Sequence, residues 1–259
     1  MKAGLIIRHR DDENIAKANE GGIMETFQSP EARMEQIIAT QVKKWQLNMK
    51  KKYKKPIRPV ITMSRLPGSG ANTLAKHLSD DLNIDLFDNE IVGAVARSAN
   101  VSESVVATLD EQDRSILDDW IGALEKKHHL WPDEYLPHLT KVVGAIAAHG
   151  HAIIVGRGAG YILPSDVCLR LLIVAPMDIR VRNVMHAYDV TYKEAEQRII
   201  KTEKDRKAFV KRYFNADLTD PVNYDLTLNT AHYTVEAAAS IIKEAFNARP
   251  WYDYSMKKP

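Results

Sequence analysis

Residues 57–82, IRPVITMSRLPGSGANTLAKHLSDDL, combine residue types that can bind a phosphate group. A β-rich apolar run enters a loop that holds Gly68 and Gly70, and the next segment places three leucines four residues apart, ending at Leu82. This spacing predicts a strand, a tight loop and an amphipathic helix. In such a loop, backbone N–H groups converge on an anion at the positive end of the helix, and glycines let the backbone approach closely.

The charges of this loop differ from the common phosphate-binding pattern G-x-x-x-x-G-K-[ST]. With its second glycine at Gly70, the pattern places its first glycine on Arg65, its lysine on Ala71 and its hydroxyl residue on Asn72. Alanine cannot meet the charge of a transferring phosphoryl group as lysine does, whereas Arg65 could supply a guanidinium from the other side of the loop. The alternative is an ordinary turn, because proline followed by glycine punctuates many connections. The hydroxyl groups that favour a phosphate site over a turn belong to Ser64, Ser69 and Thr73.

Two charged residues follow other predicted strands. Asp88 ends the short run 84–87, where it can cap the next helix or present a carboxylate to an acceptor nucleotide or a hydrated magnesium ion. Arg157 follows the buried run 152–156, where it is either a surface residue or a guanidinium that binds a phosphate through two hydrogen bonds. Ligands of parallel sheets lie beyond the carboxyl ends of the strands. We therefore expect both residues near the glycine loop.

A basic run lies between residues 198 and 212. Most such runs are solvated helix faces. In a phosphoryl-transfer enzyme the same run would be a mobile cover that folds arginines over the phosphates and excludes water. Its basic residues, set against only Glu203 and Asp205, are Arg198, Lys201, Lys204, Arg206, Lys207, Lys211 and Arg212.

Strands and helices alternate along most of the chain, which predicts an α/β fold with a parallel sheet covered by helices on both faces. Helices fill roughly 89–148, with expected interruptions near Asn100, Pro132 and Pro137. Thr191 and Glu194 form a capping box for a long charged helix. A last helix is capped by Thr234, and the remaining strands are predicted at 152–156, 169–174 and 224–229.

Residues 1–56 form a predicted extension, with a boundary near residue 56 before the main domain, 57–259. Ser29 and Pro30 suit the start of an amphipathic helix that continues to about residue 47. A basic linker follows, from Lys50 to Arg58, which a flexible solvated segment explains better than nucleic-acid binding. The apolar stripe of the helix needs cover. Either a homodimer or packing against its own domain would provide it.

Composition places the chain among ordinary globular proteins. Of its 259 residues, 45% are hydrophobic and 27% charged, and the formal net charge is +2, so nothing forces a nucleic-acid or membrane partner. Its single cysteine, Cys168, excludes a disulfide framework, and its histidine pairs lack further zinc ligands at suitable spacing. No run is long enough to span a membrane, and the first residues turn charged too soon for a signal peptide. We expect a cytoplasmic protein.

Together, these segments resemble the cytidylate-kinase-like family of nucleoside monophosphate kinases. The resemblance covers about residues 58–246 and rests on five segments in order: ITMSRLPGSGANTLAKHL, IDLFDNEIV, AIIVGRGAGYIL, KTEKDRKAFVKRYF and DPVNYDLTLNT. It implies a three-layer P-loop kinase fold with a core, a helical acceptor-binding region and a lid. It also implies transfer of the γ-phosphoryl group of ATP, with Mg²⁺, to a pyrimidine nucleoside monophosphate such as CMP or dCMP.

The same resemblance assigns roles to residues of this chain. Asp88 and Arg157 would face the acceptor, and Arg206 and Arg212 would close from the lid. The guanidinium of Arg65, inferred above from its place beside the loop, would join them. The residues that would hold the donor phosphates are Ser64, Gly68, Ser69, Gly70, Ala71, Asn72 and Thr73, with Thr73 as the hydroxyl for magnesium. Two alternatives remain: a nucleotide sensor with little turnover, which Ala71 favours, and a kinase of another small acceptor.

Overall fold

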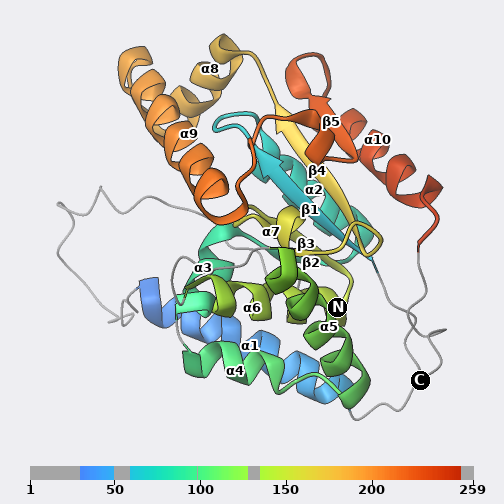
Figure 1. Cartoon of the computed structure of the whole chain (residues 1–259). Coiled ribbons are helices and arrows are strands. Elements are labelled where there is room, and N and C mark those ends of the chain that lie inside the picture. Colours follow the sequence, from blue (N-terminus) through green and yellow to red (C-terminus); the bar gives the residue numbers. More distant parts are fainter. Residues whose placement is uncertain (1–29, 50–58, 98, 128–134, 252–259) are drawn as a thin grey trace, which may run out of the picture.

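The computed structural model of the chain describes residues 30–49, 59–97, 99–127 and 135–251 (Figure 1). The predictions for Ser29, the basic linker, Pro132 and the pair His128 and His129 lie outside these residues. The α-helices are α1 (Pro30–Met49), α2 (Ala71–Leu82), α3 (Asn89–Arg97), α4 (Ala99–Val106), α5 (Glu111–Lys127), α6 (Tyr135–His149), α7 (Ala159–Ile162), α8 (Met177–Tyr188), α9 (Tyr192–Phe214) and α10 (Val235–Ala248). The strands are β1 (Val60–Arg65), β2 (Asp85–Phe87), β3 (Ala152–Val155), β4 (Cys168–Val174) and β5 (Leu226–Asn229), and two short 3₁₀ turns are η1 (Pro221–Asn223) and η2 (Thr230–His232).

The five strands form one parallel sheet in the order β2-β3-β1-β4-β5, which confirms the predicted fold class. β1 lies at the centre, where Ile61 is in register with Ile153 of β3 on one side and with Leu169 of β4 on the other. Because all strands run in the same direction, the segments that follow them meet at one edge of the sheet. That edge contains the glycine loop, Asp88 and Arg157.

Alternate residues of the strands serve two separate cores, as the pleat of a buried strand requires. On one face, Ile61 and Met63 of β1 pack with Leu74 and Leu78 of α2 and with residues of α10. On the other face, Val60 joins the cluster that includes the helices α3 to α6. The sheet with its two covers gives the three layers visible in Figure 1.

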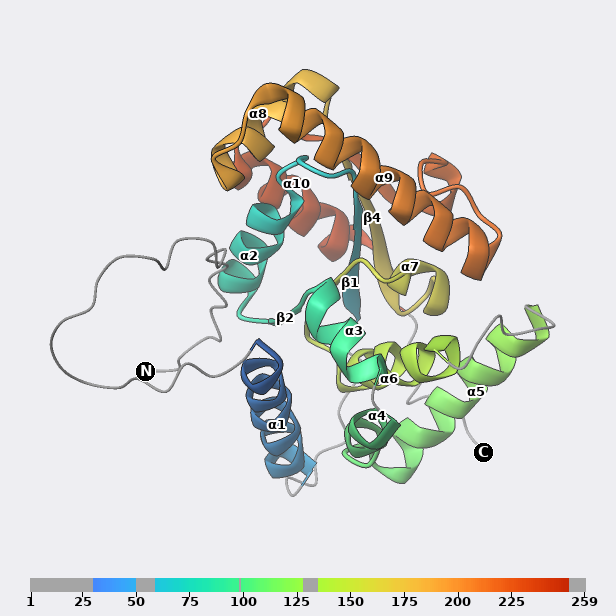
Figure 2. The ribbon, with the colours of Figure 1, turned by 90° about the vertical axis from the view of Figure 1, so that its left-hand side faces the viewer.

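The helices α8 and α9 form a unit of their own above the carboxyl ends of the strands. Their small apolar cluster consists of Val181, Val184, Ala195 and Ile199. The capping box of Thr191 and Glu194 is present and fixes the start of α9. Figure 2 shows the loop after β1 running beneath these two helices, which places the basic run over the predicted site.

Helix α1 packs against its own domain. Ile38 and Trp45 are buried in the same cluster as α3 and α6, and the Trp45 ring is stacked on His149 with ring centroids 4.2 Å apart. Lys44 forms an ion pair with Asp85 at the start of β2. The apolar stripe of α1 is therefore covered within the chain. The homodimer through this helix and the boundary at residue 56 remain predictions.

The structure corrects one predicted break and adds two details. Pro137 does not interrupt a helix: it lies in the first turn of α6, where a backbone N–H would have no intrahelical partner. A break that was not predicted separates α4 from α5, where Asp110 caps α5 by accepting from the Asp113 N–H at 2.8 Å. The predicted glycine turn after β3 continues into the short helix α7.

Candidate active site

The loop after β1 has the backbone of an anion-binding turn. Gly68 and Gly70 take φ values of +80° and +77°, a region that side chains strongly disfavour. The N-cap residue of α2 is Gly70, which has no side chain to cap the helix, and the first N–H groups of a helix have no intrahelical acceptor. The Ser69 hydroxyl is buried, and the described residues offer it no hydrogen-bond partner. The loop can therefore offer backbone and hydroxyl donors to a phosphate.

Contacts from both sides hold this loop in place. Asn183 of α8 donates its amide N–H to the Gly68 carbonyl at 2.8 Å, and the Thr230 hydroxyl donates to the Ser69 carbonyl at 2.9 Å. A Cβ atom on Gly68 would lie 2.5 Å from the Arg180 carbonyl oxygen, so α8 packs directly on the glycine. The loop geometry therefore depends on α8 and on the segment after β5.

Arg65 lies at the end of β1 with 7% of its surface exposed. Its Nη2 donates to Asn89 Oδ1 at 2.6 Å, whereas the described residues provide no partner for its Nε. A Cβ atom on Gly156 would lie 2.3 Å from Arg65 Nη1, so only glycine leaves room for this guanidinium. The side chain is thus enclosed but incompletely hydrogen-bonded.

Two further guanidinium groups come to the same place from other elements. Arg157 donates from Nε to the Asn89 carbonyl at 2.8 Å and lies against Gly93 of α3, where a Cβ atom would be 2.7 Å from Nη2. Its own backbone has a φ of +52°, a strained value for arginine. Arg206 of α9 donates from Nη1 to the Arg65 carbonyl at 2.9 Å.

The electrostatics of the three arginines favour an anion. Burial, and then the positive charge of Arg206, lowers the pKa of Arg65; Asp88 opposes this, and Arg157 adds to it. Burial also lowers the pKa of Arg206. A buried guanidinium with like charges around it is stabilised when a phosphate arrives.

The other predicted residues take more varied places. Asp88 Oδ1 accepts from the backbone N–H groups of Glu90 and Ile91, both at 2.9 Å, so it caps α3 and also acts on Arg65 through its charge. Asn72 and Thr73 are exposed in the first turn of α2, whereas Ala71 is buried.

Two predicted residues have aromatic neighbours. Ser64 is near Tyr224, in the segment before β5: burial raises the pKa of Tyr224, and Ser64 opposes that rise. Arg212, near the end of α9, is exposed with its guanidinium 5.3 Å from the centre of the Tyr213 ring. The structure brings Arg65, Arg157 and Arg206 together, and it places the Arg212 guanidinium beside a tyrosine near the end of α9.

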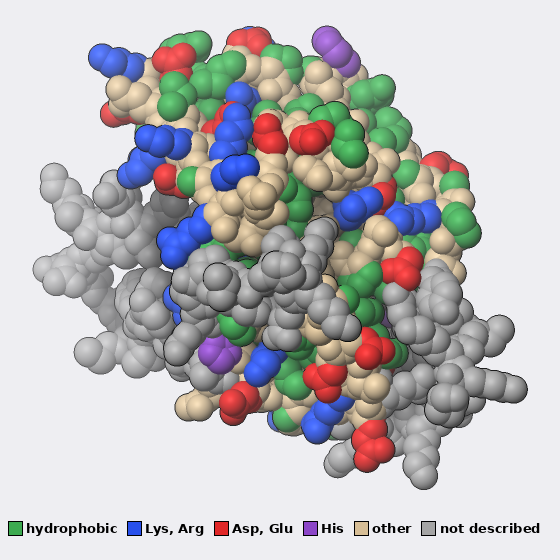
Figure 3. Space-filling model, in the orientation of Figure 1, with side chains coloured by type: hydrophobic (Ala, Val, Ile, Leu, Met, Phe, Trp, Pro, Cys, Tyr) green, Lys and Arg blue, Asp and Glu red, His purple; other side chains and the backbone are tan. Residues whose placement is uncertain are grey.

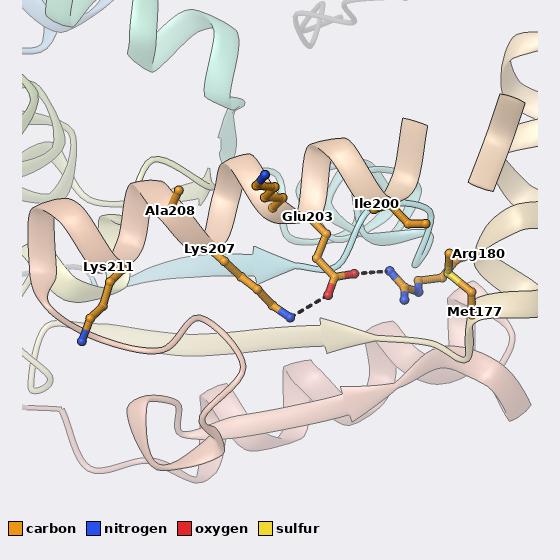
Figure 4. Close-up of a pocket in the computed structure, with 8 residues that line it drawn as sticks. Met177, Arg180, Ile200, Glu203, Lys207, Ala208 and Lys211 are labelled. Carbon is orange, nitrogen blue, oxygen red and sulfur yellow. Dashed lines mark hydrogen bonds and ion pairs between the residues drawn. The ribbon is translucent and has the colours of Figure 1, made fainter. Parts of the chain in front are cut away.

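Basic side chains gather over α9 on the face shown in Figure 3. Between α8 and α9 lies an open groove of about 640 Å³ (Figure 4). Arg180 and Lys207 each contact Glu203 at 2.8 Å, and although partial burial opposes it, these hydrogen bonds lower the pKa of Glu203. Arg180 lines the groove and its backbone carbonyl also lies against Gly68, so the groove and the loop share this residue. Its lining residues are Met177, Arg180, Ile200, Glu203, Lys204, Lys207, Ala208 and Lys211.

Sequence reasoning missed several residues that shape this site. Asn89 joins Arg65 to Arg157, and its only signal was its position directly after Asp88 at a strand end. Asn183 and Thr230 hold the loop through its carbonyl groups, and Arg180 packs on Gly68. No pattern marks these three, because their contacts join elements that lie more than a hundred residues from the loop.

Comparison with known proteins agrees with this architecture. Residues 60–232 match the cytidylate kinase-like family. The chain is 27% identical over 184 residues to a cytidylate kinase of Aeropyrum pernix, covering 71% of this chain and 96% of that protein. It is 26% identical over 192 residues to a cytidylate kinase of Methanosarcina barkeri, covering 73% and 96%.

A crystal structure of an uncharacterized protein from Eubacterium ventriosum shares the fold. Its TM-score is 0.53 at 22% identity, with 74% of this chain and all of that chain covered. The family match begins at β1 and ends at η2, so it includes the glycine loop, the three arginines and the whole of α9. It spans well over half of the residues, and the chain therefore belongs to the cytidylate kinase-like family.

Proposed function

We propose that this chain transfers the γ-phosphoryl group of ATP to a nucleoside monophosphate, with CMP or dCMP as the acceptor. The observation that carries the proposal is the meeting of Arg65, Arg157 and Arg206 beside the glycine loop. Phosphoryl transfer requires in-line alignment and positive charge around the equatorial oxygens, and it requires no protein nucleophile. Three guanidinium groups from three elements supply that charge.

The donor and the acceptor would approach this cluster from opposite sides. The loop and the first turn of α2 suit the donor phosphates, and the basic groove beside Gly68 suits the rest of the triphosphate nucleotide. The acceptor phosphate would lie against Arg157, on the side of α3 and Asp88. The family's relatives named cytidylate kinase suggest a cytosine base.

Magnesium fits this arrangement as a companion of the nucleotide. In the described segments, no group of three or more histidine, cysteine, aspartate or glutamate residues could hold a metal ion. Mg²⁺ is commonly bound by one or two protein groups together with substrate phosphates, and the exposed Thr73 hydroxyl at the start of α2 could contribute one of them. When bound, the ion neutralises developing charge on the phosphates.

One observation favours a second function, a nucleotide sensor with little turnover. Ala71 brings no charge to the start of α2, while α8 and α9 already contact the loop through Asn183 and Arg206. Such a protein would bind ATP, pass the resulting closure of α8 and α9 on to a partner, and transfer the phosphoryl group only slowly. A kinase of another small acceptor would use the same arginines.

No helix in the described part of the chain is long and apolar enough to cross a membrane.

The decisive experiment is ADP release from ATP and Mg²⁺ in a coupled assay, screened across nucleoside monophosphates. We expect release that depends on the acceptor and is fastest with CMP or dCMP. Tight ATP binding without stimulation by any monophosphate would favour the sensor. Stimulation by an acceptor outside the nucleotides would favour the other kinase.

The charge of Arg65 leads to a prediction about thermal stability. We expect Arg65→Met to leave the Tm of the free protein within a few degrees of wild type, because the lost hydrogen bond is offset by removal of a buried like charge. The rise in Tm on adding CMP should shrink, since the site would offer one cation fewer to the phosphate of CMP. Differential scanning fluorimetry measures both.

Arg170→Met is the matched control. Arg170 lies on the neighbouring strand β4, and its Nη2 pairs with Asp225 at 2.7 Å. The same substitution there leaves Asp225 with fewer partners, so the Tm of the free protein should fall while the rise caused by CMP persists. A large fall in Tm for Arg65→Met would show that its charge is well compensated without a ligand.

A further inference from the structure

Asn89 accepts hydrogen bonds from two of the three arginines. Its side-chain oxygen accepts from Arg65 Nη2 at 2.6 Å, and its backbone oxygen accepts from Arg157 Nε at 2.8 Å. It is the first residue of α3, and Asp88 fixes that turn by accepting from the two N–H groups that follow Asn89. Asn89 therefore ties the end of β1 and the turn after β3 to a capped helix.

The packing around Asn89 leaves the two guanidinium groups little freedom. Gly156 lies beside both Arg65 and Asn89: a Cβ atom on it would lie 2.3 Å from Arg65 Nη1 and 3.4 Å from Asn89 Cβ. Gly93, one turn further along α3, leaves space for the Arg157 guanidinium. The hydrogen bonds to Asn89 thus select the orientation, and the glycines provide the room.

The chemistry of an amide suits this position better than that of a carboxylate. An amide oxygen accepts a hydrogen bond but does not neutralise the guanidinium, so the positive charge of Arg65 remains available to a ligand. A carboxylate at the same place would form an ion pair with Arg65 and would repel an incoming phosphate. The start of a helix otherwise favours aspartate through the helix dipole.

We propose that Asn89 is a positioning residue that orients Arg65 through its side-chain oxygen and Arg157 through its backbone carbonyl toward the phosphate of the acceptor, without adding a negative charge of its own. This inference rests on the proposed function for the identity of the acceptor. It adds that an uncharged acceptor of hydrogen bonds is required at position 89.

The test compares Asn89→Ala and Asn89→Asp. We expect Asn89→Ala to raise the KM for CMP roughly 10- to 30-fold, the effect of one lost hydrogen bond to a charged group. Asn89→Asp should raise it at least as much, while the KM for ATP changes little in both variants. The Tm values should follow a different order, with Asn89→Asp equal to or above wild type and Asn89→Ala below it. A role confined to the helix would make affinity follow Tm.

Inorganic phosphate provides a readout that needs neither turnover nor a base. We expect the rise in Tm caused by phosphate to be largest for wild type, smaller for Asn89→Ala and smallest for Asn89→Asp. Asn247→Asp, the same chemical change on the exposed part of α10, should match wild type.

The outcomes for the two claims are distinct. If Asn89→Asp binds phosphate and CMP as wild type does, Asn89 is only a helix residue, and the proposed function is unaffected. If wild type releases no ADP with any monophosphate but the phosphate series holds, the proposed kinase activity fails and the role of Asn89 stands.

Discussion

Replacing Arg157 with alanine should lower kcat/KM for acceptor-dependent ADP release by about 10³-fold, the scale of losing an arginine that neutralises transition-state charge. Arg157 reaches the site from a strained turn between two glycines of positive φ, and its side chain is fixed by the Asn89 carbonyl and by Gly93. Arg65 also bonds to Asn89, but through its side-chain oxygen, so among the described hydrogen bonds only that of Arg157 reaches the Asn89 carbonyl. Steady-state kinetics with CMP varied at saturating ATP would measure the effect.

The control for this prediction is Arg198→Ala. Arg198 lies exposed on α9 with its guanidinium 5.2 Å from the centre of the Tyr188 ring. The substitution therefore removes one positive charge from α9 and leaves Arg65, Arg157 and Arg206 in place. We expect a change of less than about threefold, as for most exposed charges. Equal losses in the two variants would mean that the net charge of the lid region, rather than the position of Arg157, supports turnover.

Periodicity predicted the sheet well, because its strands are nearly continuous apolar runs and its helices carry strong end signals. Thr191 and Thr234 cap α9 and α10 as expected. Local signals failed where tertiary packing decides. Pro137 fits the first turn of α6, where it removes no intrahelical hydrogen bond and its ring meets no carbonyl of a preceding helical turn. The short α7 follows a turn that two glycines and a strained arginine make.

The site was predictable in part, and for a physical reason. Residues at the ends of parallel strands must meet, so the glycine loop, Asp88 and Arg157 could be placed together before their contacts were seen. The sequence could assign α9 to the segment that would cover the phosphates, but it could not determine how the helix is rotated about its own axis. That rotation directs Arg206 to the Arg65 carbonyl, sets Lys207 and Lys211 in the groove, and leaves Arg212 on a tyrosine.

The structure also shows where Ala71 lies, at the position where the phosphate-binding pattern has a lysine. Ala71 is buried against the core of the sheet, so its side chain does not face the space in front of the loop. The positive charge comes instead from β1, from the turn after β3 and from α9. Charge supplied from three elements depends on how α8 and α9 sit on the loop, which makes the packing at Gly68 critical.

Replacing Gly68 with alanine should be the most damaging small change in the loop. The new Cβ atom would lie 2.5 Å from the Arg180 carbonyl oxygen, and neither backbone can yield cheaply. The φ of +80° adds about 1 kcal/mol or more for a residue with a side chain. We expect the free energy of unfolding to fall by about 2–4 kcal/mol and turnover to fall at least about 10²-fold, because α8 must move and α9, which packs on α8 and carries Arg206, must move with it. Chemical denaturation and the ADP assay measure the two effects.

Gly70→Ala separates backbone strain from packing. Gly70 has nearly the same φ, +77°, but nothing lies within 4 Å of the position of its Cβ atom. Stability should therefore fall by only about 1 kcal/mol, while nucleotide affinity should still drop, since that open space is where the phosphates would enter. Equal destabilisation by both substitutions would show that φ alone matters and that α8 is not seated on Gly68. A stable Gly70→Ala protein with full affinity for ATP would place the phosphates elsewhere.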